Sequence, residues 1–229
     1  MRIAVVSTQC NGKTTLVEAL KHQWPNYTIA TTSDYRQLIK DKNLPINEGA
    51  SIEGQRIIRD ALSDQAIQYA SDTHVIHDRC ILDNTVYSIY LAEKGKITDS
   101  DFVADSINIC RESMKMFDII FWLQLNPNIK LTNDGKSDRS VNAEFRTEID
   151  AIFHGVYQSF RHSEGIMFPL EDSPTMIMLE GDLSQKLKTI GEYLDHTGEL
   201  VEIEESAMAE LQSQFEKENF LDEVRTGKA

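Results

Sequence analysis

Short apolar runs alternate with longer amphipathic segments along the chain. Five runs rich in β-branched and aromatic residues predict strands at residues 3–6, 27–31, 74–77, 118–125 and 175–180. Between them, apolar residues recur at helical spacing, which predicts helices over residues 13–23, 52–69, 84–93, 99–116, 143–161 and 183–194. Strands that alternate with helices in this way are typical of an α/β fold. The pattern therefore predicts a five-stranded parallel sheet with helices on both faces.

The loop after the first predicted strand carries the most specific motif. Residues 7–15, Ser-Thr-Gln-Cys-Asn-Gly-Lys-Thr-Thr, match the phosphate-binding pattern G-x-x-x-x-G-K-[ST], with Ser7 in place of the first glycine. In this pattern backbone N–H groups surround the β-phosphate, Lys13 contacts the β- and γ-phosphates, and Thr14 binds Mg²⁺. We therefore predict a site for ATP and Mg²⁺ that is formed by Ser7, Cys10, Asn11, Gly12, Lys13, Thr14 and Thr15.

The third predicted strand leads directly into Asp78 and Arg79. Ligands of open parallel sheets bind at the carboxyl ends of the strands, so these side chains are expected close to the phosphate loop. A carboxylate in that place usually contacts Mg²⁺, a water of its shell or the hydroxyl that accepts the phosphoryl group. Asp78 is thus a predicted metal residue together with Thr14, and Arg79 is predicted to contact a substrate phosphate or the transition state. The alternatives are a turn cap for Asp78 and a surface position for Arg79.

Two further strand ends carry candidate residues. Asp34 and Arg36 follow the second strand, and Asp34 is either a general base or a cap for a helix that begins near Tyr35. After the fourth strand come Lys136, Arg139 and Arg146. If that segment is helical throughout, Arg139 and Arg146 share one face two turns apart.

Composition narrows the class of protein. A formal charge of −14 argues against broad non-specific binding to nucleic acid, although a local basic cleft stays compatible with it. The chain has no apolar run of 18 residues and no signal-peptide core, so we expect a cytoplasmic protein without a membrane span. We expect one domain over residues 1–197 and an acidic C-terminal extension over 198–229, in which apolar residues recur at helical spacing.

Together these motifs resemble those of the P-loop kinases that phosphorylate nucleosides and nucleotides, over residues 1 to about 195. "HDRCILDNTVYS" resembles the D-R-x-x-x-D-N segment of phage and bacterial nucleotide-kinase-like ATP-binding proteins, and its Asp-Arg start is similar to that of thymidylate kinases. "DGKSDRS" and the following "EFR" resemble their lid, here about residues 132–147. The resemblance implies a three-layer P-loop NTPase fold and an ATP-dependent phosphotransferase. Its catalytic residues would be Lys13, Asp34, Asp78, Arg79, Arg139 and Arg146.

A narrower resemblance concerns "SDYRQ", which is similar to the acceptor-activating segment of phage polynucleotide kinases. There an Asp accepts the proton of a nucleic-acid hydroxyl and a nearby Arg binds phosphate, roles that would fall to Asp34 and Arg36. The aspartate of that family aligns with Ser33, one position earlier. The general base is therefore either Asp34 or Asp78, and the substrate-binding residues are Asp34, Arg36 and Arg79.

Three functions are compatible with these residues. The first is a kinase for a soluble nucleoside or nucleotide such as a deoxynucleoside monophosphate, which the acidic charge favours. The second is a kinase for a hydroxyl of DNA or RNA, at a 5′ end or on a hydroxymethylated pyrimidine base. The third is an NTP-dependent switch that is not a kinase, which two lid arginines in the same chain disfavour. The expected partner is the nucleoside or nucleotide acceptor, with nucleic acid as the alternative, and a homodimer is left open.

Overall fold

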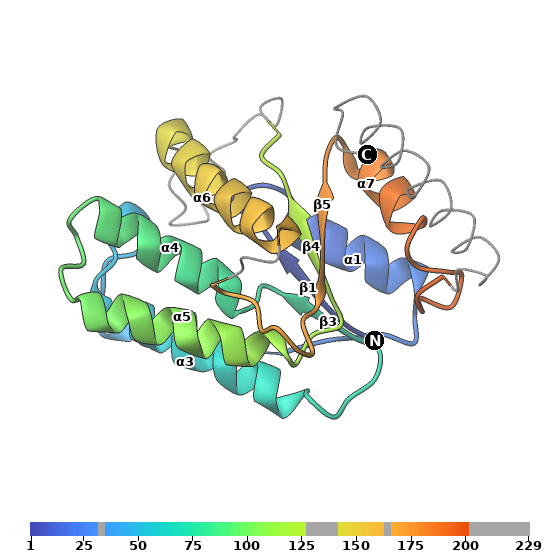
Figure 1. Cartoon of the computed structure of the whole chain (residues 1–229), viewed down its shortest axis with the longest axis horizontal. Helices are drawn as coiled ribbons and strands as arrows, with labels where there is room; N and C mark the ends of the chain where they lie inside the picture. The colour runs from blue at the N-terminus through green and yellow to red at the C-terminus, as the bar shows by residue number, and fades with distance from the viewer. Residues whose placement is uncertain (32–34, 127–141, 163–165, 202–229) are drawn as a thin grey trace, which may run out of the picture. The chain divides into compact units, whose positions relative to one another are not determined.

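The computed structural model describes residues 1–31, 35–126, 142–162 and 166–201 (Figure 1). The chain divides into two compact units, Met1–Thr189 and Ile190–Ala229. The predicted domain boundary after residue 197 stays a prediction. Among the described residues, no helix combines the length and apolar character needed to span a bilayer.

Five parallel strands form the sheet of the first unit, in the order β2-β3-β1-β4-β5. Their bounds are β1 Arg2–Val6, β2 Thr28–Ile29, β3 Val75–Asp78, β4 Ile119–Leu123 and β5 Thr175–Leu179. All residues of β4 and nearly all of β1 are buried, as expected for strands with helices on both faces. The predicted five-stranded α/β fold is confirmed, although β2 is shorter than its apolar run.

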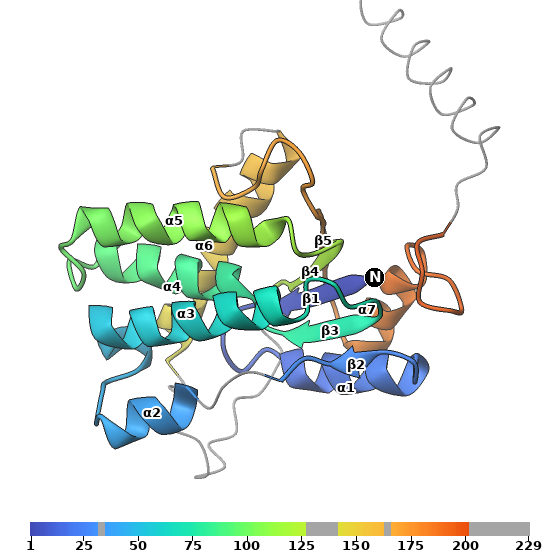
Figure 2. The same cartoon turned by 90° about the horizontal axis from the view of Figure 1, so that it is seen from below.

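Helices cover both faces of this sheet. Their bounds are α1 Lys13–Gln23, α2 Tyr35–Asp41, α3 Ile52–Gln68, α4 Ile81–Glu93, α5 Ser100–Met114, α6 Ala143–Arg161 and α7 Leu183–Ile190, with a 3₁₀ turn at Asn47–Gly49. Figures 1 and 2 show α3, α4, α5 and α6 on one side of the sheet and α1 and α7 on the other. The short α2 contacts α3, close to the end of the sheet that carries the phosphate loop.

Local capping explains where several helices begin. Ser51 accepts a hydrogen bond from Gly54 N, and Asp99 accepts one from Phe102 N, so each satisfies an N–H group of the first turn. Helix α4 begins three residues before its predicted start because Cys80 and Asp83 form a capping box there. Helix α7 ends at Ile190, before its predicted end, and a glycine follows it.

The described part of the second unit is a turn that ends at Val201. A single antiparallel bridge joins Leu194 and Leu200, and Asp195 Oδ1 accepts hydrogen bonds from the N–H groups of Thr197 and Glu199. The predicted acidic C-terminal helix lies outside the described residues.

Candidate active site

The phosphate loop joins β1 to α1, and its backbone explains which glycine the motif retains. Gly12 adopts a φ of 83°, and among the described residues no atom lies within 4 Å of a Cβ built on it. The requirement for glycine there is therefore conformational rather than steric. Ser7, at the position of the first glycine, is fully buried and has no positive φ, so a small side chain is tolerated there.

Lys13 points back into the loop that precedes it. Its Nζ donates hydrogen bonds to the backbone oxygens of Ser7 at 2.8 Å and Thr8 at 3.0 Å, and to Ser7 Oγ at 3.1 Å. The side chain is only 6% exposed, and Asp83 Oδ1 lies 3.8 Å from Nζ. The ammonium group therefore lies inside the loop, where the motif requires a cation for phosphate.

Thr14 and Asp78 meet at the mouth of the loop. Because β1 and β3 are neighbours with Val5 opposite Asp78, the carboxylate lies beside the start of α1. Thr14 Oγ1 donates a hydrogen bond of 2.7 Å to Asp78 Oδ2. In the described part of the chain, no cluster of three or more metal-ligating side chains occurs. A hydroxyl and a carboxylate fit Mg²⁺, which binds few protein oxygens and completes its shell with phosphate and water.

Arg79 has an unusual backbone conformation, with a φ of 92°. Its N–H donates a hydrogen bond to Val5 O at 3.1 Å, and its Nη1 lies 3.9 Å from Asp83 Oδ1. Burial disfavours the charge of this guanidinium group, yet Asp83 and other nearby groups hold the pKa of Arg79 above its usual value. Arg79 is therefore a charged group that is fixed at the end of β3.

Arg146 contacts the phosphate loop from α6. Its Nε donates to Gln9 O at 3.1 Å and its Nη2 to Cys10 O at 3.3 Å, and burial lowers the pKa of this guanidinium group. In this arrangement Arg146 supports the backbone of the loop, and its predicted role at the transferred phosphoryl group stays a prediction. The other lid candidates, Lys136 and Arg139, lie outside the described residues.

Asn11 joins the loop to the end of β4. Its Nδ2 donates to the backbone oxygens of Leu123 at 2.8 Å and Gln124 at 3.0 Å, while its Oδ1 accepts from Asn126 N. The loop is thus fixed by β4 as well as by α6. The motif marks the position of Asn11 without indicating this contact.

A cavity of about 730 Å³ extends from the phosphate loop to α2, α3 and α4. Arg36, Asp78 and Arg79 line it together with loop residues 10–15, so the structure brings predicted residues from three segments of the chain to one cavity. Arg36 is exposed and its guanidinium carbon lies 5.4 Å from the centre of the Tyr35 ring. Asp34, the candidate base beside it, lies outside the described residues.

Gln55 and Asn84 also line this cavity, and neither was predicted as a site residue from the sequence. Asn84 Nδ2 donates to Gln55 Oε1 at 2.7 Å and to Gln55 O at 3.1 Å. Asn84 Oδ1 is buried and, within the described ranges, has no hydrogen-bond partner. Asn84 could have been found from the sequence, because it is the last residue of the D-R-x-x-x-D-N segment. Gln55 belongs to no motif and lies in an ordinary helical pattern.

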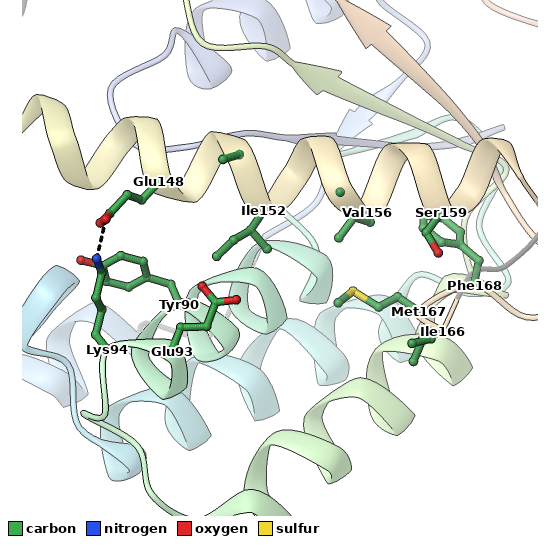
Figure 3. Close-up of a pocket in the computed structure, with 12 residues that line it drawn as sticks. Tyr90, Glu93, Lys94, Glu148, Ile152, Val156, Ser159, Ile166, Met167 and Phe168 are labelled. Atoms are coloured by element: carbon green, nitrogen blue, oxygen red, sulfur yellow. Dashed lines mark hydrogen bonds and ion pairs between the residues drawn. The ribbon is translucent and has the colours of Figure 1, made fainter.

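A second cavity, of about 600 Å³, lies between α4 and α6 and is flanked by residues 166–168 (Figure 3). Ile152, Val156 and Met167 contribute apolar surface to it. At one end Lys94 and Glu148 form an ion pair. None of the predicted site residues that the structure describes lines this cavity.

Solved structures with the same fold include a nucleoside kinase and a nucleotide kinase. A deoxyadenosine kinase from M. mycoides matches with a TM-score of 0.61 and 16% identity, over 83% of this chain and 96% of that chain. A thymidylate kinase from Candida albicans matches with a TM-score of 0.55 and 14% identity, over 88% and 95%. The chain also matches 51% of a NadR protein in complex with NAD and AMP-PNP, with a TM-score of 0.57 and 17% identity, over 88% of this chain.

These likenesses define the class: the chain has the three-layer fold of P-loop nucleotide kinases, and the resemblance read from its motifs is confirmed. A family model described as an AAA domain matches residues 2–167, and the chain belongs to that family. No curated protein matches the chain in sequence.

Proposed function

We propose that the chain is an ATP-dependent kinase that transfers the γ-phosphoryl group of ATP to a nucleoside or nucleotide. The observation that carries the proposal is the 2.7 Å hydrogen bond between Thr14 Oγ1 and Asp78 Oδ2. It joins the hydroxyl that the loop motif assigns to Mg²⁺ with a carboxylate from the adjacent strand, as in other P-loop NTP sites. The deoxyadenosine and thymidylate kinases that share the fold support the class of acceptor.

On the donor side, the loop amides and Lys13 would hold the phosphates of ATP. Thr14 and Asp78 would contribute oxygens to the Mg²⁺ shell, and the bound ion would neutralise charge on the β- and γ-phosphates. Asn11 and Arg146 hold the backbone of the loop in place. Catalysis would then depend mostly on positioning and electrostatic stabilisation.

On the acceptor side, a hydroxyl or phosphate oxygen would attack the γ-phosphorus while the bond to the β–γ bridging oxygen breaks. A proton released by a hydroxyl acceptor would pass to Asp34 or Asp78. Arg79 and Arg139 would stabilise the migrating charge. Arg146 would do so only after releasing the carbonyl oxygens of the loop, because its guanidinium group is bonded to them.

The polar lining of the cavity suits a nucleoside as the acceptor. Gln55 and Asn84 present amide groups, and the free acceptor lone pairs of Asn84 Oδ1 match an N–H group of a base. A volume of about 730 Å³ is in the range of small-molecule sites.

The decisive experiment is a transfer assay with labelled ATP and Mg²⁺. Nucleosides, nucleoside monophosphates, oligonucleotides and oligonucleotides with hydroxymethylated pyrimidines are supplied side by side. We expect label in a nucleoside or nucleotide product. Hydrolysis of ATP with no labelled product from any acceptor would instead favour an NTP-dependent switch.

The second candidate is a kinase for a hydroxyl of DNA or RNA, and the position of Arg36 is the observation that favours it. Arg36 is exposed at the same cavity, where it could hold a flanking phosphate. Activity on a polymer would then fall steeply as salt rises, because phosphate contacts release counterions. A net charge of −14 opposes this candidate.

The variants Arg36→Ala and Arg79→Ala separate the two acceptors. With a mononucleotide acceptor, Arg36→Ala should be mild. Arg79→Ala should raise KM for the acceptor, or lower kcat if the contact forms only in the transition state. Transfer to oligonucleotides alone, lost in Arg36→Ala, would establish the polymer as the substrate.

A further inference from the structure

Asp83 is a buried carboxylate between the two cations of the candidate site. It is 1% exposed, and its Oδ1 lies 3.8 Å from Lys13 Nζ and 3.9 Å from Arg79 Nη1. Lys13 belongs to the phosphate loop and Arg79 to the end of β3. The same carboxylate oxygen therefore lies within ion-pair distance of the donor-side cation and of the cation assigned to the acceptor.

The backbone contacts of Asp83 do not require its charge. Oδ1 accepts a hydrogen bond from Ser7 N and Oδ2 accepts one from Cys80 N, each at 3.4 Å. The second contact is half of the capping box of α4, a role that neutral side chains perform as well. An asparagine at this position could keep an oxygen for a backbone N–H group.

The charge of Asp83 is costly where it lies. Burial raises the pKa of this carboxyl, while Lys13 and Arg79 act in the opposite direction. A buried carboxylate is retained when it compensates nearby cations, and removing it would leave two cations to repel each other. Both distances exceed hydrogen-bond length, so Asp83 occupies no N–H group of either cation and acts on them through its charge.

We propose that Asp83 is a positioning residue that acts through Lys13 and Arg79, and that it aligns the donor and acceptor cations for phosphoryl transfer. This role rests on the proposed kinase activity. In this role Asp83 would bind neither substrate directly. Its effect should therefore appear in kcat rather than in the affinity for Mg-ATP, because the loop amides and Lys13 still bind the phosphates when it is neutral.

The test is a double-mutant cycle of Asp83→Asn and Arg79→Ala in the transfer assay. We expect Asp83→Asn to lower kcat about 10²-fold, the loss typical of a catalytic group misplaced by about 1 Å. The dissociation constant for Mg-ATP, measured by calorimetry, should stay within about threefold. In the Arg79→Ala background, Asp83→Asn should lower kcat by a clearly smaller factor, because one of the two cations that Asp83 positions is already absent.

Asp118→Asn is the matched control. Asp118 also pairs with an arginine, Arg2 at 2.7 Å, but it immediately precedes β4, at the amino-terminal end of the parallel strands and away from the phosphate loop. This variant should keep kcat within about twofold. If Asp83→Asn does not fold, Asp83→Ser, which retains a capping oxygen, takes its place in the cycle.

Equal losses from Asp83→Asn in the parent and in Arg79→Ala would overturn the proposal, as would an unchanged kcat. Both results assume that the parent transfers phosphate. A parent that binds Mg-ATP and phosphorylates no acceptor would contradict the proposed function itself, so the two failures are distinguishable.

Discussion

Two cavities of similar size differ in where their charged groups lie. In the cavity beside the phosphate loop, of about 730 Å³, Lys13 and Asp83 are both almost fully buried. In the cavity between α4 and α6, of about 600 Å³, the ion pair of Lys94 and Glu148 is exposed and the rest of the lining is largely apolar. Volume therefore does not distinguish them. The buried charges of the first cavity distinguish the two. Burying a charged group is costly, and such groups are retained mostly at functional sites.

The largest expected effect comes from removing the lysine of each cavity. Lys13→Ala should abolish the stabilisation that Mg-ATP gives the parent and should lower transfer about 10³-fold, since the cation for the β- and γ-phosphates is lost. Lys94→Ala, the control from the second cavity, should keep both properties. The measurements are the thermal transition with and without Mg-ATP and the rate of transfer. Equal shifts by Mg-ATP in the parent and Lys13→Ala would contradict the assignment of the loop.

The next effect concerns the metal. Thr14→Val keeps the shape of the side chain and removes the oxygen that is bonded to Asp78, so transfer should fall about 10²-fold. The Mg²⁺ concentration for half-maximal activity should rise. Thr147→Val is the control, an exposed threonine of α6 whose hydroxyl bonds Ala143 O. A magnesium titration that gives the same midpoint for parent and Thr14→Val would exclude Thr14 as a ligand.

A smaller effect concerns the stability of the fold around β3, the strand that ends at Asp78 in the first cavity. His77 is buried against Phe117 and bonds Gln65 Oε1 at 3.1 Å, and burial lowers its pKa to about 4. An unfolded histidine titrates near pH 6.5, so between pH 6.5 and 4 the unfolded chain binds more protons. The free energy of unfolding should therefore fall as the pH falls through this window, by about 3 kcal/mol at most.

Urea unfolding of the parent and of His77→Asn from pH 7 to pH 4 checks this expectation. The variant lacks the group that titrates, so its dependence on pH should be weaker by that amount, whatever its stability at pH 7. Parallel curves for the two proteins would show that His77 does not cause the dependence.

The smallest effect belongs to the second cavity. Gly155 lies within α6, and among the described residues no atom lies within 4 Å of a Cβ built there. Gly155→Ala should raise the free energy of unfolding by about 0.5–1 kcal/mol through helix propensity and leave transfer unchanged. Gly181→Ala is the opposite control, because φ is +81° and the new Cβ would meet Gln185. A loss of transfer in Gly155→Ala would mean that the second cavity affects the chemistry.

The fold was largely predictable because strands buried on both faces appear in the sequence as apolar runs. The five strands and the six long helices follow from that pattern. The 3₁₀ turn at Asn47–Gly49 has no periodicity of its own, so the pattern does not reveal it. Helix α2 is short, and its start near Tyr35 was only an alternative interpretation of Asp34.

The placement of the candidate site residues was predictable where they lie in one continuous segment or at a strand end. The loop motif indicated Lys13 and Thr14, and the strand-end rule brought Asp78 next to them. The sequence did not indicate the environment of Asp83, because its carboxylate lies near Lys13 only once α4 has packed at the end of β1. The contact of Arg146 with the carbonyl oxygens of the loop likewise depends on how α6 packs, so the resemblance of its segment to a kinase lid did not indicate it.

The central position of β1 also has a consequence for the order of folding. Ile3 of this strand lies opposite Ile76 of β3 and Ile119 of β4, so both neighbours follow it at long sequence separation. During synthesis the strand that leads into the phosphate loop emerges before either neighbour and stays unpaired until β3 and then β4 have been made. Such long-range pairing is slow to form. We therefore expect nucleotide binding to appear only late in folding. A bound nucleotide should stabilise only those chains in which the sheet is complete.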